Sequence, residues 1–116
     1  MRNLKNNHIP NHVEKIYLIS ICGTGMGALA CMLKDLGFQV SGSDQKIYPP
    51  MSTFLAEKGI PIHSGFNKKH ISSVPDLVIV GNAVTKDNPE VLQMRKMGLC
   101  YCSMPQAVNR FMLSGK

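Results

Sequence analysis

A glycine-rich turn that directly follows an apolar segment constrains the fold of this chain more than any other feature. Residues 16–21 (Ile-Tyr-Leu-Ile-Ser-Ile) are mostly apolar and β-branched, which is typical of a buried strand. Residues 23–28 (Gly-Thr-Gly-Met-Gly-Ala) follow with the form G-x-G-x-x-A. Apolar residues then recur at helical spacing from Met26 to Leu36, and Gly37 supplies a stop. These patterns predict a strand, a tight turn and a helix.

The alternation of strand and helix continues along the chain. Further strands are predicted at 38–42, 60–63, 77–80 and 99–102, and further helices at 51–58, at about 89–97 after an Asn88 cap, and from a Ser103 cap to about Leu113. Strand–helix–strand units of this kind form parallel sheets with right-handed crossovers. The sequence therefore predicts a single α/β domain, a Rossmann-like open parallel sheet flanked by helices on both faces. Residues 1–14 are interpreted as a polar N-terminal arm and residues 15–116 as the domain.

Length and apolar content are those of one small globular domain. The chain has 116 residues, of which 44% are hydrophobic, an ordinary share for a soluble protein. Its longest apolar runs, such as residues 77–80, have the length of a strand and fall far short of a membrane span. Residues 1–14 also lack the apolar stretch of a signal peptide. We therefore expect a cytoplasmic protein with no membrane partner.

The charge balance says little about partners. A net charge of +6 would suit an anionic ligand, but the basic residues are scattered along the sequence. No dense basic run is interleaved with aromatic residues, so we interpret the basic residues as solvated and expect no nucleic-acid partner.

Neither a metal site nor a covalent catalytic set is predicted. The four cysteines are Cys22, Cys31, Cys100 and Cys102, and no further cysteine or histidine stands at metal-ligand spacing from them. Without an export signal, we expect buried free thiols rather than disulfides. The histidines show no pairing with a nucleophile that the sequence can establish.

The glycine turn has the composition of a phosphate-binding loop. Its first glycine permits the tight turn, its second lets the backbone approach a phosphate closely, and the small Ala28 allows the helix to pack against the strand. The helix N-terminus then offers unpaired N–H groups and partial positive charge to an anion. A tight strand-to-helix turn without any ligand is the alternative interpretation of the same pattern.

Two further loops follow predicted strands at the edge where open α/β sheets bind ligands. Asp44 stands at about the distance from Gly23 where dinucleotide-binding folds place the acid that holds a ribose, but Ser43-Asp44 also suits an Asx turn. Residues 81–84 (Gly-Asn-Ala-Val) follow the strongest strand, and Asn82 offers both donor and acceptor; an ordinary loop is the alternative. From these residues alone, an NAD(P)-binding module of a dehydrogenase or redox sensor remains possible.

Longer stretches resemble one family. Residues 21–30 are similar to the first loop and helix of the Mur ligases, which add amino acids or peptides to UDP-N-acetylmuramic acid, and residues 41–44 resemble the loop that closes their second strand. Residues 48–53, and 81–84 together with 88–91, resemble the branch that adds a peptide during murein recycling more than the branch that adds L-alanine. The resemblance extends from about residue 16 to 113. Tyr17 and Ser20 depart from it, because His and Gly are expected there.

The resemblance implies a Rossmann-like first domain that holds UDP rather than NAD. The UDP-N-acetylmuramate site it implies consists of Gly23, Thr24, Gly25, Met26, Gly27, Ser43, Asp44, Asn82, Ala83 and Val84. ATP and Mg²⁺ belong to a second domain of the family, and a third domain helps to hold the incoming peptide; ATP phosphorylates the muramoyl carboxylate, which the peptide's amine then attacks. We therefore expect this chain to be a fragment without the ATP-binding and C-terminal domains, with no cofactor of its own and no activity alone.

Overall fold

The computed structural model describes residues 6–23 and 25–113. Its strands are β1 (Lys15–Ile19), β2 (Gln39–Asp44), β3 (Ile62–Ser64), β4 (Leu77–Val80) and β5 (Tyr101–Ser103). Its α-helices are α1 (Met26–Asp35), α2 (Met51–Glu57), α3 (Pro89–Lys96) and α4 (Met104–Val108), with a short 3-10 helix η2 (Lys68–His70) and a π-helical turn η3 (Asn109–Leu113).

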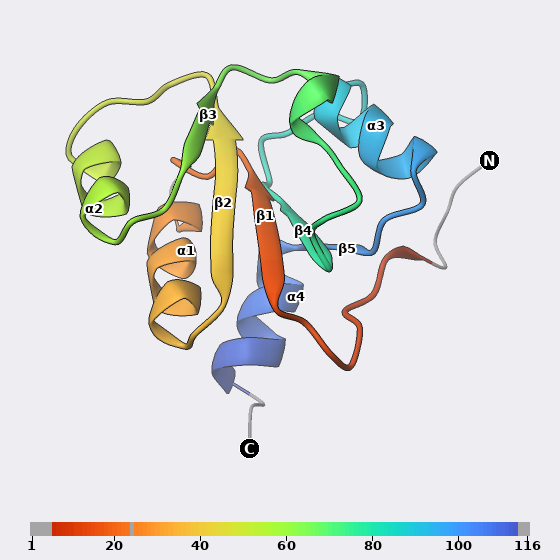
Figure 1. Ribbon diagram of the computed structural model, residues 1–116, viewed down its shortest axis with the longest axis horizontal. Coiled ribbons are helices and arrows are strands. Elements are labelled where there is room, and N and C mark those ends of the chain that lie inside the picture. Colours follow the sequence, from red (N-terminus) through yellow and green to blue (C-terminus); the bar gives the residue numbers. More distant parts are fainter. Residues whose placement is uncertain (1–5, 24, 114–116) are drawn as a thin grey trace.

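The strands form one parallel sheet in the order β3-β2-β1-β4-β5 (Figure 1). Central β1 pairs with β2 on one side and β4 on the other, so that Ile16 lies opposite both Val40 and Leu77. The chain runs outward from β1 to β3, then crosses back to β4. In open α/β sheets such a reversal leaves a crevice at the carboxyl ends of the two strands beside it, where ligands bind. The glycine loop follows β1 and residues 81–84 follow β4, so both lie at this switch point.

Helices cover both faces of the sheet, as predicted. One core contains residues of α1, α2 and α4, such as Leu33, Leu55 and Ala107, packed with strand residues such as Leu18. The other core lies beneath α3 and joins Val91 and Met94 to Tyr17, Ile19 and Val78. Figure 1 shows α1 and α2 side by side next to β2 and α3 beyond β4. Neighbouring strand residues alternate between the two cores, because successive side chains of a strand point to opposite faces.

The first strand is shorter than predicted, because it ends at Ile19 rather than at Ile21. Ser20 has a φ of 72°, in the left-handed region that favours glycine. The N–H groups of Ser20 and Ile21 both donate to the carbonyl oxygen of Ser43, at 2.9 Å each. The chain therefore leaves the sheet at Ser20, which is the position where the resemblance led us to expect glycine.

Predicted caps begin the last two α-helices. The Asn88 side chain accepts from Glu90 N–H at the start of α3, with Pro89 in the first turn. Ser103 and Gln106 form a reciprocal capping box on α4. The predicted closing helix is not continuous, because its α-helical part ends at Val108 and a π-helical turn completes it.

The described part of the N-terminal arm contacts the domain. Ile9 and Val13 pack against the core beneath α1 and α4. The Arg110 guanidinium donates to the carbonyl oxygens of Ile9 and Pro10, at 3.5 and 3.2 Å.

Candidate functional site

The glycine loop turns tightly between β1 and α1. Gly23 N–H donates to the Ser20 carbonyl oxygen at 3.1 Å, and Met26 N–H donates to the Gly23 carbonyl oxygen at 3.0 Å. Gly25 has a φ of 82°, and a Cβ atom added there would lie 3.1 Å from the Met104 sulfur. Its conformation therefore favours glycine at this position, and the nearby Met104 side chain would have to shift slightly to admit a larger residue. Thr24, which was predicted to contact the ligand, lies outside the described residues.

Gly27 is needed for packing between helices. A Cβ atom added at this residue would lie 2.2 Å from the Met51 sulfur, which shows that α2 approaches α1 at this point. Gly27 is buried, whereas Ala28 is exposed. The role predicted for Ala28, packing of the helix against the strand, was therefore wrong, because Ala28 is exposed, and the buried Gly27 instead allows α2 to approach α1. The buried Met26 side chain packs into the core.

The start of α1 is open to an anion. No side chain caps the helix at Gly25, and its first turn contains no acidic residue. The N–H groups of Met26 and Gly27 both donate to the Gly23 carbonyl oxygen, at 3.0 and 3.3 Å, so the partial positive charge of this end comes from the helix dipole. The neighbouring Lys46 is exposed and adds a full positive charge at the same edge of the sheet.

Ser43 and Asp44 hold the glycine loop in place. The Asp44 carboxylate accepts from Cys22 N–H at 2.9 Å through one oxygen and from Lys46 N–H at 3.1 Å through the other. The second bond is the Asx turn considered above, and the first ties the end of β2 to the loop. Asp44 is only 7% exposed and Ser43 is fully buried. The Ser43 hydroxyl donates to Glu90 on the other face of the sheet, so the carbonyl oxygen of Ser43, not its hydroxyl, faces the loop.

A polar cavity opens between these segments, with a volume of about 400 Å³. It is lined by Ser20, Cys22, Gly23, Asp44, Lys46, Tyr48, Pro50 and Met51. Of these, only Gly23 and Asp44 were predicted as site residues. Burial raises the pKa of the Cys22 thiol, and the Asp44 carboxylate raises it further, so this cysteine stays a neutral thiol. The other lining residues were not predicted, because the glycine motif indicates backbone contacts with a ligand and says nothing of side chains around it. The family resemblance of residues 48–53 was the one signal that included three of them, Tyr48, Pro50 and Met51.

Residues 82–84, which were predicted together as site residues, differ in their exposure to solvent. Asn82 and Ala83 are exposed, whereas Val84 is half-buried and packs against the core beneath α3. Gly81 N–H donates to the Ile19 carbonyl oxygen at 3.2 Å, and a Cβ atom added to Gly81 would lie 3.2 Å from the Ser20 Cβ. The three predicted segments therefore meet around Ser20, at the switch point of the sheet. Asn82 and Val84 also line a neighbouring cavity of about 300 Å³.

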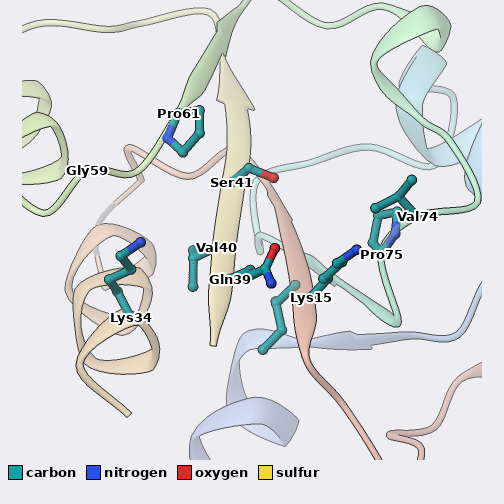
Figure 2. A pocket seen from close by; sticks show the side chains of 10 residues that line it. Lys15, Lys34, Gln39, Val40, Ser41, Gly59, Pro61, Val74 and Pro75 are labelled. Carbon is teal, nitrogen blue, oxygen red and sulfur yellow. The ribbon is translucent and has the colours of Figure 1, made fainter. Parts of the chain in front are cut away.

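Another cavity, of about 340 Å³, lies at the amino ends of the strands and contains none of the predicted site residues. Figure 2 shows Lys34 reaching it from α1 and Lys15 from β1, with Gln39 and Val40 of β2 between them. Because ligands of open α/β sheets bind at the opposite edge, this cavity is not part of the candidate site.

Across residues 6–23 and 25–113, no three His, Cys, Asp or Glu side chains are grouped as metal ligands. No helix in the same part of the chain is long and apolar enough to cross a membrane. All four cysteines are free, as predicted; Cys102 is buried, and its burial raises the pKa of the thiol to about 12. The other three cysteines are only half-buried, so the prediction of burial holds fully for Cys102 alone.

Comparison with known proteins agrees with this geometry. Residues 15–116 match the family described as "Mur ligase family, catalytic domain". The chain is 43% identical over 99 residues to UDP-N-acetylmuramate–L-alanyl-γ-D-glutamyl-meso-2,6-diaminoheptandioate ligase of Escherichia coli, which covers 85% of this chain and 22% of that protein. It is 44% identical over 96 residues to UDP-N-acetylmuramate–L-alanine ligase of Lactobacillus acidophilus, covering 82% of this chain and 22% of the relative.

A solved structure shares the fold. The murein peptide ligase of Psychrobacter arcticus superposes with a TM-score of 0.84 at 42% identity, covering 89% of this chain and 22% of that one. The chain thus spans about a fifth of the length of the relatives it matches. With the sheet order, the glycine loop and the matched residues all in agreement, the chain belongs to the Mur ligase family.

Proposed function

We propose that this chain binds UDP-N-acetylmuramate and forms the nucleotide-sugar site of an ATP-dependent ligase that attaches a peptide to that sugar. The observation that carries the proposal is the junction at Ser20, where the glycine loop, the end of β2 and the loop after β4 are joined by hydrogen bonds around an open polar cavity. The relatives that match the chain carry UDP-N-acetylmuramate ligase names, and two of them are named for joining that sugar to L-alanyl-γ-D-glutamyl-meso-2,6-diaminoheptandioate.

The charges at this edge suit a nucleoside diphosphate. The start of α1 and the Lys46 ammonium group would both attract the diphosphate, and the backbone at Gly23 and Gly25 permits close approach. Tyr48 is 62% exposed beside the cavity and offers an aromatic face to a planar base. Within the proposal, the exposed Asn82 in the loop after β4 contributes hydrogen bonds to the sugar.

Asp44 argues against the NAD(P) alternative. In NAD-binding folds the acid after the second strand accepts from ribose hydroxyls. Here both Asp44 oxygens already accept backbone N–H groups, and the side chain is almost fully buried. We therefore assign Asp44 to holding the loop rather than to binding a ribose.

Within the proposal, the ligation reaction itself takes place in parts of the whole enzyme outside this chain. No set of metal ligands lies within the described residues, so we place neither Mg²⁺ nor ATP on them and derive no catalytic step from this chain. Within the proposal, ATP, Mg²⁺ and the peptide bind to domains outside residues 15–116, this chain alone does not catalyse ligation, and the whole enzyme acts in the cytoplasm.

Amide NMR of the 116-residue chain tests the proposal directly. UDP-N-acetylmuramate should shift the amide signals of Gly23, Gly25 and Asn82 in a saturable way, whereas NADH at the same concentration should not. In multidomain enzymes, closure of neighbouring parts over the ligand adds to affinity. The 116-residue chain is expected to bind more weakly without them, so the titration should extend to millimolar concentrations. Shifts at the same residues with NADH alone would reverse the assignment in favour of a dehydrogenase-type module.

A further inference from the structure

A buried carboxylate lies on the face of the sheet opposite α1 and has no place in the site described above. Glu90, in the first turn of α3, has no exposed surface. Its Oε1 accepts from the hydroxyls of Ser43 at 2.6 Å and Tyr17 at 3.1 Å. Its Oε2 lies 2.6 Å from His70 Nδ1 and accepts from Asn67 N–H at 3.2 Å. One side chain thus joins β1, β2, η2 and α3, and each of its oxygens has two partners.

The groups around Glu90 differ in their ability to change charge. Burial raises the pKa of the Tyr17 hydroxyl well above its usual range, so Tyr17 is a neutral donor at all ordinary pH values. Ser43 and the Asn67 N–H do not ionise. His70 does, and His63 of β3 stacks on it with ring centroids 4.2 Å apart and planes 8° apart. The His70 imidazole, with His63 stacked on it, is therefore the neighbour of Glu90 that carries a positive charge when both of its ring nitrogens are protonated.

Hydrogen bonds lead from Glu90 to the glycine loop through one residue. The Ser43 hydroxyl is held by Glu90, and the Ser43 carbonyl oxygen holds the N–H groups of Ser20 and Ile21. The next residue, Asp44, holds Cys22 N–H. The backbone of Glu90 is fixed as well, because its N–H donates to Asn88, which caps the helix that follows the 81–84 loop. Glu90 is therefore bonded directly to Ser43, at the end of β2, and to Asn88, the cap of α3.

We infer that Glu90 is a positioning residue for the nucleotide-sugar site, and that the charge of His70 adjusts the site through it. This inference rests on the proposed function for its ligand. Glu90 touches no part of the open cavity; it acts by fixing Ser43, and through Ser43 the turn at Ser20.

The sign of the effect follows from charge. A protonated His70 makes a charge-assisted hydrogen bond to Glu90 and neutralises the buried negative charge behind the site. Deprotonation leaves that charge uncompensated, which disfavours an anionic ligand on the same sheet edge. UDP-N-acetylmuramate has no group that titrates near neutrality, because its phosphates are diesters and its carboxyl group is fully ionised there. We therefore expect its affinity to be about threefold higher when His70 is protonated than when it is neutral.

The first test needs no ligand. The amide signals of Ser20, Ile21 and Cys22 should shift with the same midpoint as the His70 ring in an NMR pH titration of the 116-residue chain. In His70→Gln, which keeps a donor but cannot change charge, these three signals should no longer follow that midpoint. His12→Gln is the matched control, because His12 pairs with the exposed Glu14 in the N-terminal arm and should leave the response unchanged. If the amide signals of Ser20, Ile21 and Cys22 do not change when the His70 ring titrates, the inference is wrong, whichever ligand the site binds.

The second test measures UDP-N-acetylmuramate binding by calorimetry across the same pH range. Wild type should show the threefold change, His70→Gln should show a flat profile, and Glu90→Gln should bind at least tenfold more weakly, with Glu90→Asp recovering part of the loss. If Glu90→Gln fails to fold, His70→Gln still decides the matter. No binding by the wild-type chain at any pH would count against the proposed function and leave the ligand-free result standing. A wild-type profile that stays flat, or a pH dependence that survives in His70→Gln, would count against the inference alone.

Discussion

The backbone N–H of Cys22 donates to the Asp44 carboxylate across 2.9 Å, so the residue that ends β2 holds the first residues of the glycine loop. The loop is therefore shaped by a neighbouring strand as well as by its own glycines. Removing the carboxylate should free Cys22 and Lys46 N–H together, because each donates to a different oxygen of the same group.

Asp44→Ala should weaken UDP-N-acetylmuramate binding by at least tenfold and lower the free energy of unfolding by about 2 kcal/mol, since a carboxylate that accepts two backbone hydrogen bonds is lost. Calorimetry and urea unfolding measure the two effects. Asp35→Ala is the control, because Asp35 pairs with Lys58 on the surface and should change neither quantity appreciably. Equal behaviour of the two variants would contradict the role given to Asp44.

Gly27→Ala should destabilise the chain by about 1–3 kcal/mol, because the new methyl group overlaps Met51. The flexible methionine can yield, which favours the lower end of that range. Met51→Ala should remove the overlap, so the double variant should be more stable than the sum of the two single changes predicts. Additive effects in urea unfolding would mean that Gly27 and Met51 do not pack together as described.

The pairing of Gly27 with Met51 marks a limit of inference from motifs. The form G-x-G-x-x-A predicted a small residue at position 28 for packing against the strand, whereas the close approach is that of α2 to Gly27, which only the position of α2 reveals. Periodicity and turn residues were sufficient for the alternation of elements and for the Asn88 and Ser103 caps, since these depend on local chemistry. Contacts between segments far apart in the chain leave no such local signal, which is why Glu90 was not singled out.

Ser20→Gly should stabilise the chain by up to about 1 kcal/mol, because glycine adopts the left-handed φ of 72° without the steric cost that serine bears. Thermal unfolding of wild type and variant would measure the gain. The entropy that glycine loses on folding offsets part of it. Destabilisation would mean that the Ser20 side chain contributes more to the junction than its backbone strain costs.

Lys46→Ala should lower affinity for UDP-N-acetylmuramate about fivefold at low salt, with a smaller difference at high salt, because an exposed cation loses its attraction to the diphosphate as ions screen it. Lys34→Ala removes the same charge at the opposite edge of the sheet, beside the cavity in Figure 2, and should have little effect. Titrating UDP-N-acetylmuramate into both variants at two salt concentrations distinguishes a local effect of Lys46 from an effect of the net charge of the chain. Equal losses of affinity in the two variants would mean that only the net charge matters.

Cys102 should make the chain less stable at alkaline pH. Its thiol has a pKa raised by burial from 9.0 to about 12, so the folded state keeps the proton while the unfolded chain gives it up. A raised folded-state pKa means that the contribution to stability is complete below about pH 9 and is lost as pH rises toward 12. By about pH 11 the loss from this group should reach about 3 kcal/mol.

Cys102→Ala should therefore lose less stability than wild type between pH 8 and pH 11, even though the cavity it leaves makes it less stable at pH 8. Tyr17 also has a raised pKa and loses its contribution in the same direction, so part of the alkaline decline should persist in the variant. Cys31→Ala is the control, because Cys31 is half-buried and its pKa is raised to a smaller extent than that of Cys102. Urea unfolding at the two pH values measures the difference, and parallel declines in wild type and Cys102→Ala would show that the buried thiol does not govern alkaline stability.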